Sequence, residues 1–230
     1  MNSEEPRKII ERLVNEKAVL KQNIYDNTFY AFKKLKSFLR SFVEELKKSL
    51  PTQESRVMIE YKDKGDFEAE IKVGGDTLIF LMHTNIFNFE RDHIMWKTPY
   101  VLEDQTKSYC GMICVYNFLS DSLKYNRPKD IGYLIARIFV NREMHFFVEG
   151  KRQLGFLYND YTHMILDDQK IKDVVESAVI YCLDFDLYTP PYDEMKEVSV
   201  QDIIDNAVNS QMTTGKRLGF RFQADSDRIE

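Results

Sequence analysis

The chain has few of the residues that mark specialised classes of protein. Its 230 residues include only 9 glycines, 6 prolines, 3 cysteines and 1 tryptophan. So little glycine and proline excludes a collagen-like or low-complexity chain. An odd number of cysteines argues against a disulfide-stapled secreted domain. We therefore expect a reducing compartment, the cytoplasm, where thiols stay free.

Long hydrophobic runs are also missing. The longest uncharged stretch in the central part of the chain, residues 77–89, has 13 residues and is too short to span a bilayer as a helix. Residues 1–5 are polar and acidic, unlike the basic and then apolar start of a secretory signal. No membrane partner is expected.

The net charge is −5, and it is distributed unevenly. Residues 1–50 hold 11 Lys and Arg against 7 Asp and Glu, whereas residues 165–210 hold 3 against 11. An acidic chain is a poor binder of nucleic acid, because phosphate binding needs clustered cations. The basic head and the acidic tail are instead expected to attract each other, within one fold or across a homo-oligomer.

The signatures of common catalytic sites are absent. The sequence has no G-x-G-x-x-G, H-E-x-x-H, G-x-S-x-G or C-x-x-C pattern, and Gly215–Lys216 lacks the upstream glycine of a phosphate-binding loop. Cys110 and Cys114 would lie about 13 Å apart on a strand, too far to share one zinc ion. The four histidines show no metal-ligand spacing. We expect no metal and no cofactor, and the sequence favours a non-catalytic protein.

Residues 1–50 have helical spacing. Pro6 and Pro51 are typical of a helix start and a helix stop, and the interval fits either one long helix or two. We expect the apolar face to pack on the protein's own sheet, with a coiled-coil seam as the alternative. The large side chains of this face step by three and four residues: Phe32, Leu35, Leu39, Phe42 and Leu46.

Further along the chain the spacing changes to two. Alternating residues separated by turns predict strands at 57–62, 67–73, 78–82, 131–140, 144–149 and 154–158. Residues 109–118 fit a strand or a helix, and their β-branched side chains favour a strand. A helix is predicted from residue 168 to 182, a short helix at 199–209 and an edge strand at 218–222.

These elements predict an α+β fold. A largely antiparallel sheet of about six to eight strands should be packed by N-terminal helices and a C-terminal helix. Residues 1–50 form a helical segment that packs on the domain or on a partner, and residues 51–230 form the α+β domain. Together they are expected to make one structural unit.

The connection at residues 88–108 is the candidate functional region. It runs for about 20 residues, where about 4–6 are usual, and it holds the only tryptophan of the chain. Trp, Tyr and Arg dominate binding hot spots, so we expect it to bind a protein partner or a small ligand. The alternative is that Trp96 closes the end of the sheet. The predicted binding residues are Phe89, Arg91, His93, Trp96, Lys97 and Tyr100.

Two E-x-K tripeptides on neighbouring predicted strands provide an alternative function. Restriction-like nucleases place an Asp on one strand and E-x-K on the next, so that carboxylates hold Mg²⁺ and the Lys positions a water. A metal-dependent hydrolase or nuclease would here use Glu60, Glu70 and Lys72. The Asp of that pattern is missing from the first strand, and alternating charge on a solvated strand face also explains both tripeptides.

Overall fold

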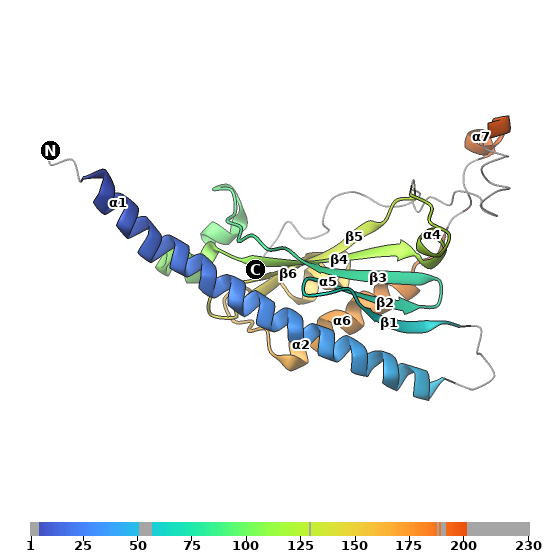
Figure 1. Cartoon of the computed structure of the whole chain (residues 1–230), viewed down its shortest axis with the longest axis horizontal. Coiled ribbons are helices and arrows are strands. Elements are labelled where there is room, and N and C mark those ends of the chain that lie inside the picture. Colours follow the sequence, from blue (N-terminus) through green and yellow to red (C-terminus); the bar gives the residue numbers. More distant parts are fainter. Residues whose placement is uncertain (1–4, 51–56, 129, 188, 190–191, 202–230) are drawn as a thin grey trace.

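The computed structural model describes residues 5–50, 57–128, 130–187, 189 and 192–201. The predicted helix stop at Pro51 and the predicted edge strand at 218–222 lie outside these ranges, as does most of the helix expected at 199–209. The described part is an α+β fold built on one six-stranded antiparallel sheet, as the sequence predicts (Figure 1).

One continuous helical rod precedes the sheet. It begins with α1 (Pro6–Leu13), passes through a π-helical turn, η1 (Val14–Ala18), and continues as α2 (Val19–Ser49). Proline fits the first turn of α1 because the N–H it lacks would have no partner there. The N-terminal segment is therefore one rod with a single irregularity, not two separate helices.

The six strands lie in the sheet in their order along the chain, each antiparallel to the next. The tight turns at Gly65 and Gly74 have φ of +95° and +60°, which glycine adopts without strain. The predicted hairpins are confirmed, and residues 109–118 contribute a strand. The strands are β1 (Ile59–Asp63), β2 (Glu68–Val73), β3 (Asp76–Met82), β4 (Gly111–Leu119), β5 (Tyr133–Val140) and β6 (Phe146–Gly150).

The rod covers one face of the sheet together with α6 (Asp168–Leu183), which lies beside α2 (Figure 1). The predicted packing of the apolar stripe on the protein's own sheet is confirmed. α2 lies close to β4 at Gly111, where an added Cβ would overlap Thr28 Oγ1. Of the predicted stripe, Phe32, Leu35 and Leu39 are buried, and Phe42 and Leu46 are partly buried against the same core.

One ion pair joins the basic head to the acidic tail within the chain. Lys34 Nζ on α2 lies 3.2 Å from Asp168 Oδ2 at the start of α6. Both side chains are well exposed, so solvent screens the pair and it contributes little to stability. Packing of apolar side chains, not this charge pair, holds the two helices together.

The strand predicted at residues 154–158 is wrong: these residues mostly form a short helix, α5 (Gln153–Leu157). Its apolar residues fit both periods, but only Leu154 and Tyr158, four apart, are buried, whereas Phe156 and Leu157 are exposed. Arg152 before the helix has φ of +48° and turns the chain away from β6. The described residues also form the short helices α4 (Ser120–Lys124) and α7 (Tyr192–Met195).

The opposite face of the sheet carries the 88–108 connection over β5 and β6. The connection is mostly helical, with η3 (Ile94–Lys97), α3 (Pro99–Glu103) and η4 (Gln105–Ser108). It packs in a second, smaller core that is separate from the one under α2. The buried members of this core are Met95, Tyr100, Val101, Cys110, Phe139, Phe147 and Tyr161.

Candidate functional site

Local hydrogen bonds explain why the 88–108 connection is ordered. The His93 Nδ1 accepts from Met95 N at 3.2 Å and caps η3. The Asp104 carboxylate accepts from Thr106 N at 2.9 Å and caps η4, and hydrogen bonds from Thr106 lower the pKa of this carboxyl. The 88–108 connection is therefore held in a defined conformation by its own capping hydrogen bonds.

Two of the predicted binding residues attach the first half of the connection to the sheet. The Phe89 ring lies 5.0 Å from the Phe139 ring and 5.6 Å from the Phe147 ring. The His93 ring packs on Phe89 at 4.6 Å. Both Phe89 and His93 are half-buried, so only part of each side chain is accessible to a partner.

Glu149 on β6 contacts two basic side chains of the site. Its carboxylate pairs with the guanidinium of Arg137 on β5 and lies 3.5 Å from His93 Nε2. Burial has the largest effect on the Glu149 pKa and raises it, but the hydrogen bond with His93 and the Arg137 interactions outweigh burial and leave the pKa lowered. His93 is thereby fixed against the sheet.

Trp96 is half-buried. It is neither fully exposed nor fully buried as a plug at the end of the sheet. Its indole Nε1 donates to the Phe89 carbonyl at 3.2 Å. The exposed Arg91 places its guanidinium carbon 4.0 Å from the centre of the Trp96 ring, a cation–π distance. The indole is thus partly covered by the protein and partly exposed to solvent.

Tyr100 lies deeper than the other predicted binding residues. Its hydroxyl donates to Glu143 Oε2 at 2.6 Å and accepts from Asn141 Nδ2 at 3.0 Å. The ring stacks on His145 at 4.4 Å. Burial, more than the bond to Glu143, raises the Tyr100 pKa. Tyr100 fastens α3 to the β5–β6 turn, and a direct contact with a partner stays a prediction.

Asn141 makes the hydrogen bonds that hold Tyr100 and the β5–β6 turn together. The sequence predicts only a turn at this position. The side chain is fully buried. Its Oδ1 accepts from the backbone N–H groups of Glu143 and His145 at 2.9 and 3.0 Å. Its Nδ2 donates to Tyr100 and, at 3.5 Å, to the Lys107 carbonyl. No sequence pattern links residue 141 to residues 100–107, because the contact arises only from folding.

A groove of about 500 Å³ opens beside η3. Of the six predicted binding residues, Lys97 lines it. Among the described residues Lys97 has no ionic partner, whereas His163 Nδ1 lies 3.0 Å from Asp160 Oδ2 within the opposite wall. One wall is Ile94, Lys97, Thr98 and Pro99, and the other is Asn159, Asp160, Thr162 and His163.

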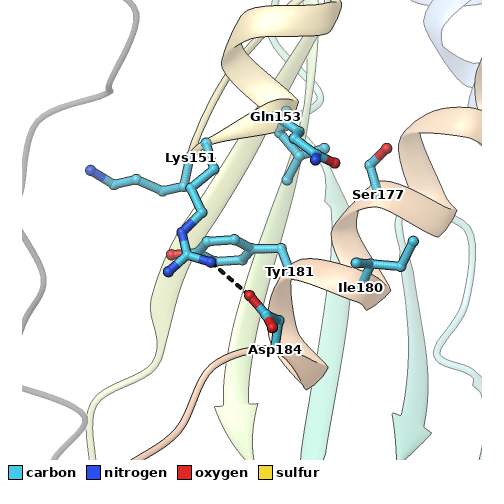
Figure 2. A pocket seen from close by; sticks show the side chains of 8 residues that line it. Lys151, Gln153, Ser177, Ile180, Tyr181 and Asp184 are labelled. Carbon is cyan, nitrogen blue, oxygen red and sulfur yellow. Dashed lines mark hydrogen bonds and ion pairs between the residues drawn. The ribbon is translucent and has the colours of Figure 1, made fainter.

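A second cavity lies between α5 and α6, far from the predicted site in the sequence (Figure 2). Its volume is about 80 Å³, well below the roughly 300–1,000 Å³ of small-molecule sites. Arg152 Nη1 pairs with Asp184 Oδ2 at 2.8 Å, and both residues line the cavity. It has room for a few waters at most.

The residues of the alternative enzymatic hypothesis lie on the outer face of β1 and β2. Glu70 uses both carboxylate oxygens in ion pairs, with Lys62 at 3.2 Å and Lys64 at 3.3 Å. Lys72 Nζ lies 3.5 Å from Met58 Sδ, and Glu60 reaches Lys62 only at 4.0 Å. These contacts are ion pairs on a strand face with alternating charge, where Glu70 is buried and its two lysine partners are exposed.

No three His, Cys, Asp or Glu side chains of the described ranges are grouped to hold a metal ion. The His83 ring packs on Phe87, and His93 faces Glu149. Cys110 and Cys114 are buried free thiols, and burial raises the pKa of the Cys110 thiol to about 12. At that pKa the Cys110 thiol stays protonated and unreactive at neutral pH.

Replacing Trp96 by alanine should cost about 2 kcal/mol of unfolding free energy, roughly half the loss for a fully buried aromatic, because the indole is half-buried. Urea unfolding followed by far-UV circular dichroism measures this without needing the indole signal. A loss above about 3 kcal/mol would identify Trp96 as a structural plug. We would then withdraw the connection as a binding region.

Glu149 should make the protein less stable in acid. Its folded pKa lies below the unfolded value, so its stabilisation is complete above the ordinary carboxyl pKa of about 4 and is lost as the pH falls through the depressed value. Glu149→Gln should lower the urea midpoint at neutral pH. The variant should then lose less of its remaining stability than the wild type does when the pH is lowered. Parallel pH profiles for the wild type and the variant would contradict this account.

Among the described residues, no helix combines the length and apolar character needed to cross a bilayer. Comparison of the chain with protein families, with curated proteins and with solved structures finds no match.

Proposed function

We propose that this protein is a non-catalytic, self-associating binding module of the cytoplasm that takes a short protein segment in the groove beside η3. The observation that supports this most is the groove itself, about 500 Å³ in volume and bordered by the predicted binding residue Lys97. It is partly open to solvent. Small-molecule sites enclose most of their ligand, so an open groove favours an extended segment over a small molecule.

The lining of the groove defines the chemistry of the expected segment. Ile94 and Pro99 offer apolar contact, and Lys97 offers a cation without an ionic partner among the described residues. A carboxylate beside an apolar side chain would satisfy both. The neighbouring Arg91 and Trp96 pair would add further contacts with the bound segment, since Trp and Arg supply much of the binding energy of protein interfaces.

The absence of a recognisable catalytic pattern in the sequence supports the non-catalytic part of the proposal. The ion pairs of Glu70 with Lys62 and Lys64 support it further, because a carboxylate held in this way is less available to a catalytic metal. The three buried free thiols agree with a reducing compartment.

Selection of random displayed peptides on the immobilised full-length protein tests this function. We expect enrichment of peptides with Asp or Glu next to an apolar residue. Binding of the enriched peptides should fall about tenfold in Lys97→Ala, because a charge-assisted contact to a rim cation is worth about 1.4 kcal/mol. Lys48→Ala, on the exposed end of α2, is the matched control and should bind as the wild type does.

Two outcomes would overturn the proposal. The selection could give no enrichment over the starting library, or the enriched peptides could bind Lys97→Ala and the wild type equally. A hydrolytic or nuclease activity that depends on Glu70 would instead establish the alternative function.

A further inference from the structure

The side of β3, β4 and β5 that faces away from α2 carries an outer apolar patch, made of Ile79, Leu81, Tyr116 and Leu134. The register pairs Ile79 with Tyr116 and Tyr116 with Leu134, so these three side chains lie next to one another across the strands. Leu81 and Leu134 are 36 % and 40 % exposed, and the other two are half-buried. None of the four belongs to either hydrophobic core.

A sheet face that meets water normally carries polar side chains. On the same side of the sheet β1 follows this rule, with Glu60 and Lys62. The outer apolar patch departs from it. The 88–108 connection packs on Phe139 and Phe147, whereas Leu134, toward the opposite end of β5, keeps its exposure. We therefore expect another segment to cover the patch.

Residues 199–209 have the sequence of an amphipathic helix. Val200 and Gln201 are helical, and residues 202–209 lie beyond the described part of the chain. Val200 is 76 % exposed. An amphipathic helix gains most of its stability by packing its apolar face, so this face needs a surface. The apolar side chains are three and four residues apart and form one C-terminal stripe on a helix: Val200, Ile203, Ile204, Ala207 and Val208.

The chain leaves α6 at the end of the sheet where the patch lies. Asp184, directly after α6, pairs at 2.8 Å with Arg152, which follows β6. The last residue of β6 pairs with Ala136, two residues from Leu134. The segment from Asp184 to Val200 can span about 50 Å when extended. This length is sufficient to pass round the end of the sheet and reach the patch.

The C-terminal stripe and the outer apolar patch also match in length. On a helix, residues 200–208 are about 12 Å long, and three neighbouring strands span about 10 Å. Asp202 and Asp205 fall on the opposite side of the helix from the stripe. Their carboxylates would therefore stay in water when the stripe is buried.

We propose that residues 199–209 form a helix that docks its C-terminal stripe on the outer apolar patch, across β3, β4 and β5. The helix would give the sheet a cover on this side, opposite the layer of α2 and α6. This docking is independent of the groove beside η3 and of the self-association in the proposed function.

Photo-cross-linking of the full chain tests the position of the segment. With p-benzoylphenylalanine in place of Leu134, irradiation should link this position to residues 199–209 of the same molecule. Mass spectrometry of the digested product identifies the linked residues, and a denaturing gel separates links within one chain from links between two. The same probe in place of Lys48, at the exposed end of α2, is the matched control and should give no such link.

Ile203→Asp with Ile204→Asp should release the segment from the sheet. We expect the melting temperature to fall by about 5 °C, because apolar surface returns to water. The link from position 134 should fall at least tenfold. Asp205→Asn with Asn206→Asp exchanges two side chains outside the stripe and keeps the charge. This matched control should keep both the melting temperature and the link of the wild type.

Four results would overturn the proposal. A melting temperature unchanged by the Ile203 and Ile204 changes means that the stripe is not buried, and no link from position 134 means that the patch is not covered. A link to another segment of the chain, or to a second copy, identifies a different cover. None of these results would alter the peptide-selection test of the groove.

Discussion

Deleting residues 1–50 should convert the protein into an aggregating or molten species. The deletion removes Phe32, Leu35 and Leu39 from the face of the sheet that they bury. Each large apolar side chain contributes about 1.5–3 kcal/mol when buried, and α2 supplies several. Their sum is comparable to the whole stability of a domain, about 5–15 kcal/mol. The sheet face exposed in this way would also promote association.

Light scattering and near-UV circular dichroism of the refolded deletion variant measure this effect. The matched control deletes residues 1–13 only, which takes away α1 but no buried side chain of the described part. That shorter variant should keep the melting temperature of the wild type. A monomeric variant without residues 1–50 that melts as the wild type does would contradict the packing described for α2.

Asn141→Ala should be the most damaging of the single substitutions considered, with a loss of about 3 kcal/mol of unfolding free energy. The substitution leaves the backbone N–H groups of Glu143 and His145 without their acceptor inside the protein. It also removes the donor to the Tyr100 hydroxyl. Buried groups without a partner cost more than the hydrogen bonds themselves contribute.

Urea unfolding of this variant beside Arg142→Ala makes the comparison. Arg142 is the next residue of the same turn and is half-exposed, with an ion pair to Asp104 at 2.7 Å. Its loss should cost under about 1 kcal/mol. Asn141→Asp keeps the two acceptor contacts but cannot donate to Tyr100, so it should fall between. If Asn141→Ala lowers the free energy of unfolding no more than Arg142→Ala does, the hydrogen bonds of Asn141 do not hold the connection on the sheet.

Periodicity in the sequence predicted most of the fold, because each element buries one face. The strands at 57–82, the strand at 131–140 and the helix starting at Asp168 follow from spacing alone. Prediction was wrong at 154–158, where the apolar residues fit both a strand and a helix. The backbone turn at Arg152, which no side-chain pattern reveals, decides between them.

The candidate site was less accessible to sequence reasoning. Length and aromatic content singled out residues 88–108, and Lys97 lines the groove. The opposite wall, with Asp160 and His163, was not predicted, because it approaches η3 only through the turn after α5. The sequence places Tyr100 among the predicted binding residues, whereas the structure buries it in hydrogen-bond contact with Asn141. Contacts between distant segments carry no local signal in a single sequence.

We propose that the Arg91 and Trp96 pair and the groove beside η3 bind a protein segment. Fluorescence of Trp96, the only tryptophan in the chain, reports this directly during titration with a peptide enriched in the selection. The account predicts a saturable shift of the emission in the wild type, about tenfold weaker in Lys97→Ala. Emission that stays unchanged while the peptide binds would place the binding site elsewhere and contradict the account.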